Sequence, residues 1–305
     1  MGSSRISESE FPRFRYPASA GAGTYIYVLD TGVDLNHEDF EGRAEFGFDA
    51  TLALLGPEVN VTEQDQLHGT HVASTAAGAR WGVAKNARIV DVKVLRAPLD
   101  PGYKDHDNVQ KLGIDWAVWD IRQRNLVGKA VLNLSWGRFQ DGAKDSGCDS
   151  LALSINKAVD MGIPVVIAAG NEDISASHAC PANIWRAITV GAIDENNQRL
   201  HQPDFDGPGD LYELNSSNWG QVVDIFAPGA RIRAAEAGTM NGSALMTGTS
   251  LAAPHVAGVI ATWLGQQKKA KSVLDVENKI LFDLSQKGVV GDTKGSKNRL
   301  LYNGY

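Results

Sequence analysis

Apolar residues along this chain gather in short, nearly continuous runs that are rich in Val and Ile. A strand covered on both faces of a sheet has this pattern, because neither of its sides meets water. We therefore predict buried strands at residues 24–29, 88–95, 129–135 and 163–169, and two further strands at residues 187–193 and 222–226.

Between these runs, apolar residues recur at helical spacing, as Leu112, Trp116 and Trp119 do. The predicted helices are residues 109–124, 151–161, 250–266 and 272–284. Because strands and helices alternate, the pattern favours an α/β fold of three layers, in which a central, mostly parallel sheet carries helices on both faces.

Length and charge narrow the class of protein. The chain has 305 residues, 43% of them hydrophobic, which is enough for one large core, so we expect a single domain over residues 1–305. A net charge of −7 at pH 7 gives no basic surface for nucleic acid or anionic lipid. No apolar stretch approaches the roughly 20 residues that span a bilayer. We expect a monomer without nucleic-acid or membrane partners.

Three short segments carry the residue types of a nucleophilic triad. Asp30 ends the first predicted strand in a DTG motif, His68 opens an HGTH motif, and Ser250 ends a GTS motif. A serine hydroxyl becomes a strong nucleophile when an imidazole takes its proton and a carboxylate orients that imidazole. Taken singly, Asp30 suits a turn, His68 suits a capping or core position, and Ser250 suits a helix N-cap. Together they indicate catalysis.

These motifs, with AAGN at residues 168–171, resemble the signatures of the subtilases in their order, and most closely those of the fungal proteinase K branch. The resemblance runs from residues 5–7, similar to the start of a mature catalytic domain, to residues 300–303, similar to its last strand. It implies a subtilisin-like fold and a serine endopeptidase. Ser250 would form an acyl-enzyme, His68 would act as general base and acid, Asp30 would orient His68, and Asn171 would donate to the oxyanion. No cofactor is implied for the chemistry.

The resemblance also implies how a peptide binds. An extended substrate would pair with one segment, and another segment would wall the first specificity pocket. The matching residues are Ser135, Trp136 and Gly137 for the first, and Ala168, Ala169 and Gly170 for the second. Neither segment carries an acid, which favours an apolar or aromatic residue before the scissile bond. Trp136 suits either a wall for upstream residues or packing on the helix beneath.

A structural calcium site is implied as well. Asp224 matches the aspartate ligand of this branch, and the backbone carbonyls of Trp185 and Ala187 would complete the protein ligands. Trp185 stands where the family has proline. The alternative is a structural Asp224 that accepts hydrogen bonds from backbone amides.

Two departures from the family lie near the catalytic histidine. Leu67 and Ser74 stand where glycine is usual, and both add bulk there. Because of Leu67, a catalytically silent relative that binds peptides stays open as a second function. An esterase of the α/β-hydrolase type needs G-x-S-x-G and the order Ser, Asp, His, which this chain lacks.

Other polar residues have structural interpretations. We expect His71 and His255 to pack or to form hydrogen bonds within their helices. The polar cluster after the first motif, which favours a solvated turn over a metal site, comprises Asp34, His37, Glu38 and Asp39.

Cys148 and Cys180 suit either a disulfide or two reduced thiols, and we expect both to lie in loops beside the cleft. Residues 204–220 are expected to form an enlarged surface loop. The sequons at Asn60, Asn215 and Asn241 suit surface loops, whereas the sequon at Asn133 falls in a predicted core strand.

Residues 1–4 are typical of an added leader, and neither a signal peptide nor a propeptide is recognisable. The resemblance implies both, with the propeptide acting as inhibitor and folding aid. It favours secretion, with the vacuole as the alternative, and protein or peptide substrates.

Overall fold

The computed structural model describes residues 14–56, 66–96, 106–139, 147–201, 216–269 and 271–305. Within these residues, nine strands form one sheet in the order β12-β13-β9-β8-β6-β4-β1-β3-β2. The neighbours pair in parallel, apart from the antiparallel pair β12–β13. The strands are β1 (Tyr25–Asp30), β2 (Ala44–Asp49), β3 (Arg88–Lys93), β4 (Ala130–Leu134), β6 (Val165–Ala168), β8 (Ile188–Ile193), β9 (Ile225–Pro228), β12 (Ser285–Lys287) and β13 (Arg299–Leu301).

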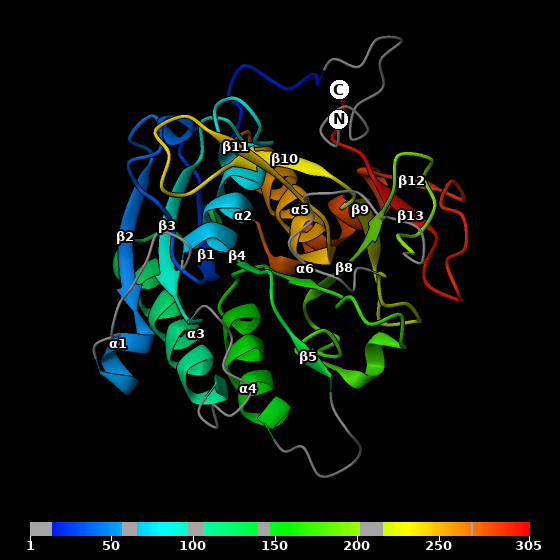
Figure 1. The fold of residues 1–305 in the computed structure, drawn as a ribbon, viewed down its shortest axis with the longest axis horizontal. Helices are drawn as coiled ribbons and strands as arrows, with labels where there is room; N and C mark the ends of the chain where they lie inside the picture. The colour runs from blue at the N-terminus through cyan, green and yellow to red at the C-terminus, as the bar shows by residue number, and fades with distance from the viewer. Residues whose placement is uncertain (1–13, 57–65, 97–105, 140–146, 202–215, 270) are drawn as a thin grey trace.

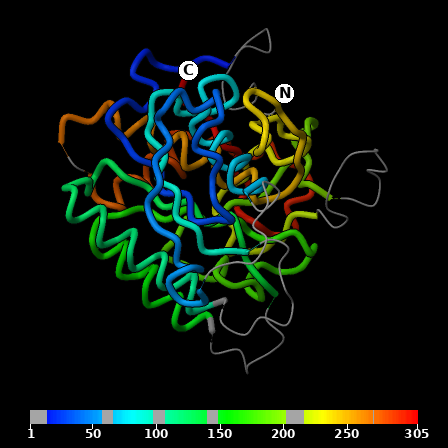
Figure 2. The backbone as a smooth tube through the Cα atoms, turned by 60° about the vertical axis from the view of Figure 1, so that its left-hand side comes forward, coloured from blue at the N-terminus to red at the C-terminus, as the bar shows by residue number. Residues whose placement is uncertain are grey.

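Helices cover both faces of the sheet, which confirms the predicted three-layer α/β fold. The helices α2 (Leu67–Ala77) and α5 (Thr249–Leu264) pack together on one face, and α3 (His106–Gln123) and α4 (Gly147–Asp160) pack together on the other. Figure 2 shows α3 and α4, in teal and green, running side by side. Alternate residues of β1 enter two different cores, so the strand is apolar along its whole length.

The central helix α5 is buried on all sides except at Trp263. It contacts β1, β4, β6, β8 and β9, which explains why its sequence is apolar at nearly every position. Its small residues allow close packing: a Cβ atom on Gly258 would lie 2.8 Å from the carbonyl oxygen of Ala76 in α2. The two helices that carry His68 and Ser250 in their first turns are thereby fixed to one another.

Several elements differ from the prediction. The strand expected at residues 222–226 begins at Ile225, because Val223 closes a turn onto Gly220. The helix expected at residues 272–284 is α6 (Val273–Asn278), which continues as a π-helical turn, η5 (Lys279–Asp283). Elements that the sequence pattern missed are the edge strand β2, α1 (Ala50–Leu55), the short helices η2 (Glu38–Phe40) and η4 (Ala176–His178), the hairpin of β10 (Ile232–Ala235) and β11 (Ser243–Met246), and the pair of β5 (Arg138–Phe139) and β7 (Ala179–Cys180).

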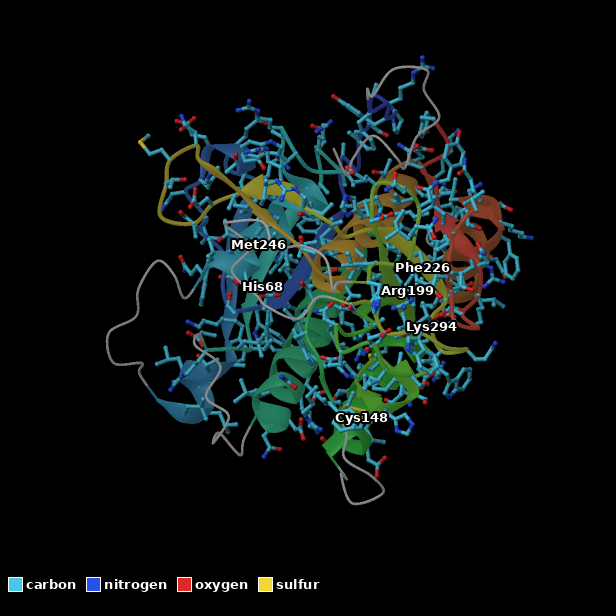
Figure 3. All side chains as sticks on the ribbon, turned by 45° about the vertical axis from the view of Figure 1, so that its right-hand side comes forward. His68, Cys148, Arg199, Phe226, Met246 and Lys294 are labelled. Atoms are coloured by element: carbon cyan, nitrogen blue, oxygen red, sulfur yellow. A yellow bond between two sulfur atoms is a disulfide. The ribbon has the colours of Figure 1, made fainter. Side chains whose placement is uncertain are left out.

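Cys148 and Cys180 form a disulfide with a Cα–Cα distance of 5.7 Å. The expectation that both lie in loops is wrong, because Cys148 belongs to α4 and Cys180 to β7. Cys148 is labelled in Figure 3. The bond ties the start of α4 to the strand that pairs with β5, close to the segment expected to bind substrate.

The sequons and the predicted loop have different outcomes. Asn241 is exposed and Asn133 is fully buried in β4, as expected. Asn60 and Asn215 lie outside the described residues, as do residues 1–7 and most of residues 204–220. The described end of that segment is not a surface loop, because Ser217 and Asn218 are fully buried. In the described part of the chain, none of the helices is both long and apolar enough to cross a bilayer.

Candidate active site

The carboxylate of Asp30 and the imidazole of His68 form a hydrogen-bonded pair. Asp30 is the last residue of β1, and His68 lies in the first turn of α2. His68 Nδ1 is 2.7 Å from Asp30 Oδ1, which also accepts a hydrogen bond from the N–H of Thr31 at 2.7 Å. Because Nδ1 donates to the carboxylate, Nε2 is left to accept a proton.

Asp30 holds the pKa of His68 above its ordinary value. Burial lowers the pKa of this imidazole, but the charge of Asp30 and the hydrogen bond to it raise the pKa by more. The side chain of His68 is 21% exposed, whereas that of Asp30 is 0% exposed. The pair is therefore accessible from the imidazole side only.

The glycine of the HGTH motif lets α2 approach the loop after β1. A Cβ atom on Gly69 would collide with the carbonyl oxygen of Gly32. The N–H of Gly69 donates to Thr31 Oγ1 at 3.1 Å. These contacts hold the start of α2 against the DTG motif, so that His68 reaches Asp30.

Ser250 lies in the first turn of α5, at the same edge of the sheet. Its carbonyl oxygen accepts a hydrogen bond from Ser135 Oγ at 2.7 Å. Ser135 directly follows β4, which is the neighbour of β1. Ser250 is thus anchored beside the strand whose last residue is Asp30, at the carboxyl ends of the strands where ligands bind in open parallel sheets.

Asn171 borders the same space as the Ser250 hydroxyl. A Cβ atom on Gly248 would lie 3.3 Å from Ser250 Oγ and 3.4 Å from Asn171 Nδ2. Asn171 Oδ1 accepts hydrogen bonds from the N–H of Thr249 at 2.8 Å and from Thr249 Oγ1 at 2.9 Å. With its oxygen held by Thr249, the carboxamide presents Nδ2 as a donor beside the serine.

Two residues that the sequence did not single out hold the Asn171 segment. Thr249 Oγ1 accepts from the N–H of Gly170 at 3.1 Å. Asn218 is fully buried. Its Oδ1 accepts hydrogen bonds from the N–H groups of Glu172 and Ile174, at 3.1 and 3.0 Å. Its Nδ2 donates to Ala169 O at 2.9 Å and to Glu172 Oε2 at 2.6 Å. The backbone on both sides of Asn171 is therefore bound to one buried amide.

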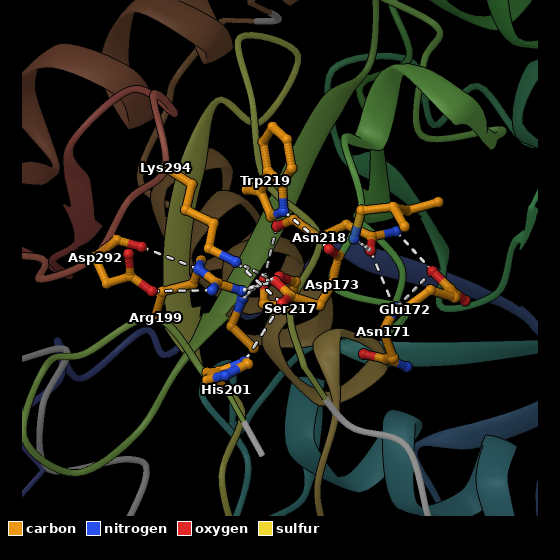
Figure 4. A network of polar contacts seen from close by, with 12 residues as sticks. Asn171, Glu172, Asp173, Arg199, His201, Ser217, Asn218, Trp219, Asp292 and Lys294 are labelled. Carbon is orange, nitrogen blue, oxygen red and sulfur yellow. Dashed lines mark hydrogen bonds and ion pairs between the residues drawn. The ribbon is translucent and has the colours of Figure 1, made fainter. Parts of the chain in front are cut away.

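A charge network lies behind this segment, and Figure 4 shows it beside Asn171. The guanidinium of Arg199, 0% exposed, pairs with Asp173 at 2.9 Å and with Asp292 at 2.9 Å. Lys294 and His201 also contact Asp173, at 3.0 and 3.5 Å. No local sequence pattern marks these residues, because their partners come from distant segments.

The residues expected to bind substrate differ in their surroundings. Gly137 is exposed, whereas Ser135 is 3% exposed and is occupied by its bond to Ser250. Trp136 is 8% exposed, belongs to the core on the α3 and α4 side, and donates from Nε1 to Leu29 O at 2.8 Å. Of the two roles expected for Trp136, a wall for upstream substrate residues or packing, these contacts fit packing.

The segment expected to wall the specificity pocket directly precedes Asn171. Ala168 and Ala169 are 4% and 0% exposed, and Gly170 is half-buried with a φ of +98°. A Cβ atom on Gly170 would collide with Asn218 Nδ2, so the close approach of that amide requires glycine here.

Ser74, one of the two departures from the family, joins a buried network. Its Oγ donates to Asp39 Oδ2 at 2.6 Å and accepts from the N–H of Ala235 at 2.9 Å. Asp39 and His37 are 5% and 2% exposed, so the expectation of a solvated turn is wrong for these two residues. The other departure, Leu67, packs against the core beneath α2.

His71 and His255 have structural partners. His255 Nδ1 lies 2.7 Å from Leu251 O within its own helix, as expected. His71 is fully buried, as packing requires, but its hydrogen bond leaves the helix, because its Nε2 lies 3.2 Å from Ala244 O, which belongs to β11. Burial lowers the pKa of both side chains to about 4, so both are neutral at pH 7.

The residues expected to hold calcium do not fit that ion. The ammonium of Lys297 lies 2.6 Å from Asp224 Oδ1, and Asp224 Oδ2 accepts from the N–H of Thr189 at 3.0 Å. Trp185 is 82% exposed and Ala187 is 3% exposed. A cation is therefore already supplied to Asp224 by the chain itself, and the remaining carboxylate oxygen is bound to backbone.

A carboxylate–imidazole pair at the same edge of a parallel sheet as a serine in the first turn of a helix is typical of a serine hydrolase. Residues 21–287 match the sequence model of Peptidase_S8, the subtilase family. The chain belongs to this family.

Similar proteins agree with this assignment. The chain is 39% identical over 290 residues to Subtilisin-like protease 3 of Pseudogymnoascus destructans, covering 95% of this chain and 64% of that protein. It is 37% identical over 289 residues to Alkaline protease 1 of Aspergillus clavatus, covering 95% and 63%. A solved structure described as a cold adapted subtilisin-like serine proteinase has a TM-score of 0.80 and 32% identity, covering 99% of this chain and 97% of that chain. The chain thus spans slightly less than two thirds of the length of the first two relatives.

Proposed function

We propose that this protein is a serine endopeptidase. The observation that supports this function best is the 2.7 Å contact between His68 Nδ1 and Asp30 Oδ1, at the sheet edge where Ser250 is anchored beside Asn171. Family membership supports the same function.

In the proposed reaction, Ser250 Oγ attacks the peptide carbonyl and its proton passes to His68 Nε2. The oxyanion accepts hydrogen bonds from Asn171 Nδ2 and from the N–H of Ser250, which lies in the first turn of α5, where backbone donors lack helical partners. His68 then protonates the leaving amine, and a water hydrolyses the acyl-enzyme by the same steps in reverse. Asp30 stabilises the imidazolium throughout.

The proposed specificity is an apolar or aromatic residue before the scissile bond. Ala168 and Ala169 supply an uncharged wall, and the acid nearest to it in the sequence, Glu172, is engaged by Asn218 and by the N–H of Asn171. We further propose that the protein is secreted, acts as a monomer on protein or peptide substrates, and is inhibited by its own propeptide. The names of the relatives support the substrate class.

A fluorophosphonate probe tests the nucleophile directly, because it reacts with an activated serine. We expect the wild type to be labelled at Ser250, and the Ser250→Ala variant to lose both labelling and peptide cleavage. A folded wild type that neither reacts nor cleaves would favour the silent peptide-binding relative. Equal cleavage by the wild type and Ser250→Ala would contradict the proposed function.

The oxyanion role has its own test. Loss of one such donor typically costs about 3 to 4 kcal/mol of barrier, a value obtained in subtilisin. We expect Asn171→Ala to lower kcat by about 10²- to 10³-fold. Full turnover by a folded Asn171→Ala variant would remove Asn171 from the mechanism.

A further inference from the structure

A pocket of about 480 Å³ adjoins the catalytic pair on the side of β2 and β3. Its wall starts at Gly32, two residues after Asp30, and includes Gln66, two residues before His68. The segments proposed to wall the specificity pocket follow β4 and β6, on the other side of β1 in the sheet. The two pockets therefore flank the catalytic pair from opposite sides.

The register of the sheet explains which side chains reach the pocket. Asp91 and Lys93 of β3 lie opposite Val28 and Asp30 of β1. Val28 enters the core on the α2 side, so Asp91, two residues before Lys93, shares the sheet face of Asp30. Both β3 side chains line the pocket.

Asp91 is a buried carboxylate with an oxygen that lacks a partner. It is 4% exposed, and its Oδ1 has no hydrogen bond within the described residues. Its pKa is raised to about 7, first by burial and then by the charges of Asp30 and Asp49, against the opposing effects of a hydrogen bond from the Val33 backbone and of Lys93. An oxygen left unpaired in this way costs free energy that a bound donor would recover.

The other charged groups of the pocket leave it with an acidic balance. Asp34 accepts from backbone N–H groups of Asn36 and Gly238, and Asp49 accepts from Thr51 Oγ1 and the N–H of Leu52. These donors are neutral, so they do not cancel the charges of the carboxylates. Among the described residues that line the pocket, three acidic side chains thus face one ammonium, that of Lys93.

We propose that this pocket binds the ammonium or guanidinium group of a Lys or Arg side chain of the substrate, with Asp91 as the acceptor. The proposal rests on the proposed peptidase function. The basic residue lies elsewhere in the substrate than the apolar residue before the scissile bond, because the two pockets lie on opposite sides of β1.

The size and lining of the pocket favour an organic cation over a metal ion. Its volume lies in the range of about 300 to 1,000 Å³ that is usual for small-molecule sites. Among the described residues, no group of three His, Cys, Asp or Glu side chains is arranged to hold a metal. Phe46 and Leu52 line the pocket, are 62% and 52% exposed, and offer apolar surface for the methylene stem of a basic side chain.

Binding can be measured without turnover in the Ser250→Ala protein. We would titrate it with acetyl-arginine amide and with acetyl-citrulline amide, an uncharged molecule of the same shape. We expect the arginine compound to bind at least about tenfold more tightly, as for a hydrogen bond between charged groups. Adding Asp91→Asn should remove this preference, whereas Asp283→Asn, at a carboxylate that is 63% exposed in η5, should leave it unchanged.

A second pair of variants leaves Asp91 in place, in case Asp91→Asn does not fold. Leu52→Lys puts an ammonium at the edge of the pocket and should compete with the arginine compound. Leu54→Lys is the matched control, because Leu54 is 47% exposed on the same short helix but does not line the pocket. Equal binding of the two compounds, equal effects of the two lysine variants, or displacement by micromolar Ca²⁺ would each overturn the proposal.

The wild type then tests whether the cation belongs to the substrate. Peptides with one Arg or one citrulline, scanned through the positions around the cut, should show at one position a kcat/KM about tenfold higher for Arg. Equal kcat/KM at every position would overturn the assignment to a substrate side chain. If no peptide were cleaved while arginine-selective binding persisted, the peptidase function would fail and the pocket would stand as a cation site.

Discussion

The ammonium of Lys297 lies 2.6 Å from the carboxylate of Asp224, where the family resemblance leads one to expect calcium. Burial raises the pKa of Asp224, and the hydrogen bond and charge of Lys297 lower it again without cancelling the effect of burial. A lysine at this distance satisfies the carboxylate without a metal.

We predict that the thermal stability contributed by this site does not depend on calcium. If Asp224 binds no calcium, the difference in Tm between EDTA and CaCl₂ should be the same for the wild type and for Asp224→Asn. If EDTA lowered the Tm of the wild type and not that of Asp224→Asn, this prediction would be contradicted.

Removal of Lys297 should make the stability of the protein depend on calcium. Lys297→Met should cost about 1 kcal/mol, since the Lys297 side chain is 39% exposed and solvent weakens the pair. It should also create a rise of Tm on addition of CaCl₂, because Asp224 then lacks a cation. Lys269→Met, at an exposed lysine, is the matched control.

The raised pKa of His68 predicts the acid limit of activity. The mechanism needs the neutral imidazole, so kcat/KM should fall as the pH drops through a value above the ordinary histidine pKa of about 6.5. Asp30→Asn should move this limb to lower pH and reduce kcat by up to about 10⁴-fold. His178→Gln, at an exposed histidine, should leave the limb in place. An unmoved limb in Asp30→Asn would contradict the assignment.

Stability should change in the opposite sense over the same pH range. A histidine whose pKa is raised by folding stabilises the fold fully below its unfolded pKa, and this contribution is lost as the pH rises through the folded value. The protonated His68–Asp30 pair is therefore most stabilising in the pH range where the proposed activity should be lost. Urea denaturation of the wild type and Asp30→Asn across this range would measure the difference.

Asn218 is predicted to position Asn171. Asn218→Ala leaves the N–H groups of Glu172 and Ile174 without their acceptor and should cost about 1 to 3 kcal/mol of stability. It should lower kcat more than it changes KM, because the oxyanion donor loses its alignment. Asn196→Ala, at an exposed asparagine, should do neither.

A double variant separates positioning from a general structural role. If Asn218 acts through Asn171, then adding Asn218→Ala to Asn171→Ala should lower kcat little further. Fully additive losses in kcat would show that Asn218 acts independently of the oxyanion donor.

The disulfide should stabilise both the fold and the substrate edge. It joins residues separated by 32 positions, for which chain entropy gives about 3 to 4 kcal/mol. Cys148→Ser with Cys180→Ser should lower the urea midpoint by a corresponding amount. A Cβ atom on Gly137 would lie 3.1 Å from Cys180 O, so the variant should also raise KM for peptides. An unchanged midpoint on reduction of the wild type would contradict a structural bond.

The sequence predicted those parts of the fold whose signals are local. The strand ending at Asp30 is apolar on both faces, and the helix containing Ser250 is apolar all round, so both could be recognised from their own residues. The edge strand β2 could not, because each of its residues is only partly buried or exposed.

The candidate site also divides into residues that a local sequence pattern reveals and residues that only tertiary contacts reveal. The motifs that carry Asp30, His68 and Ser250 stand out as short strings, whereas the supports of Asn171 do not. Asn218 occurs in a polar stretch that has the composition of a loop, and only contacts with residues 169–174 reveal that it is buried. Asp39 was misread for a similar reason, because its partner Ser74 lies 35 positions away in another element.

The buried guanidinium of Arg199 links the order of synthesis to the assembly of the segment that carries Asn171. One of its counter-charges, Asp173, is made early, and the other, Asp292, leaves the ribosome long afterwards, together with Lys294. Until that late segment has been translated, the guanidinium has Asp173 but lacks its second carboxylate partner. The support behind the loop carrying Asn171 is therefore complete only after residues 292–294 have been made, so this loop should be among the last parts of the fold to become fixed.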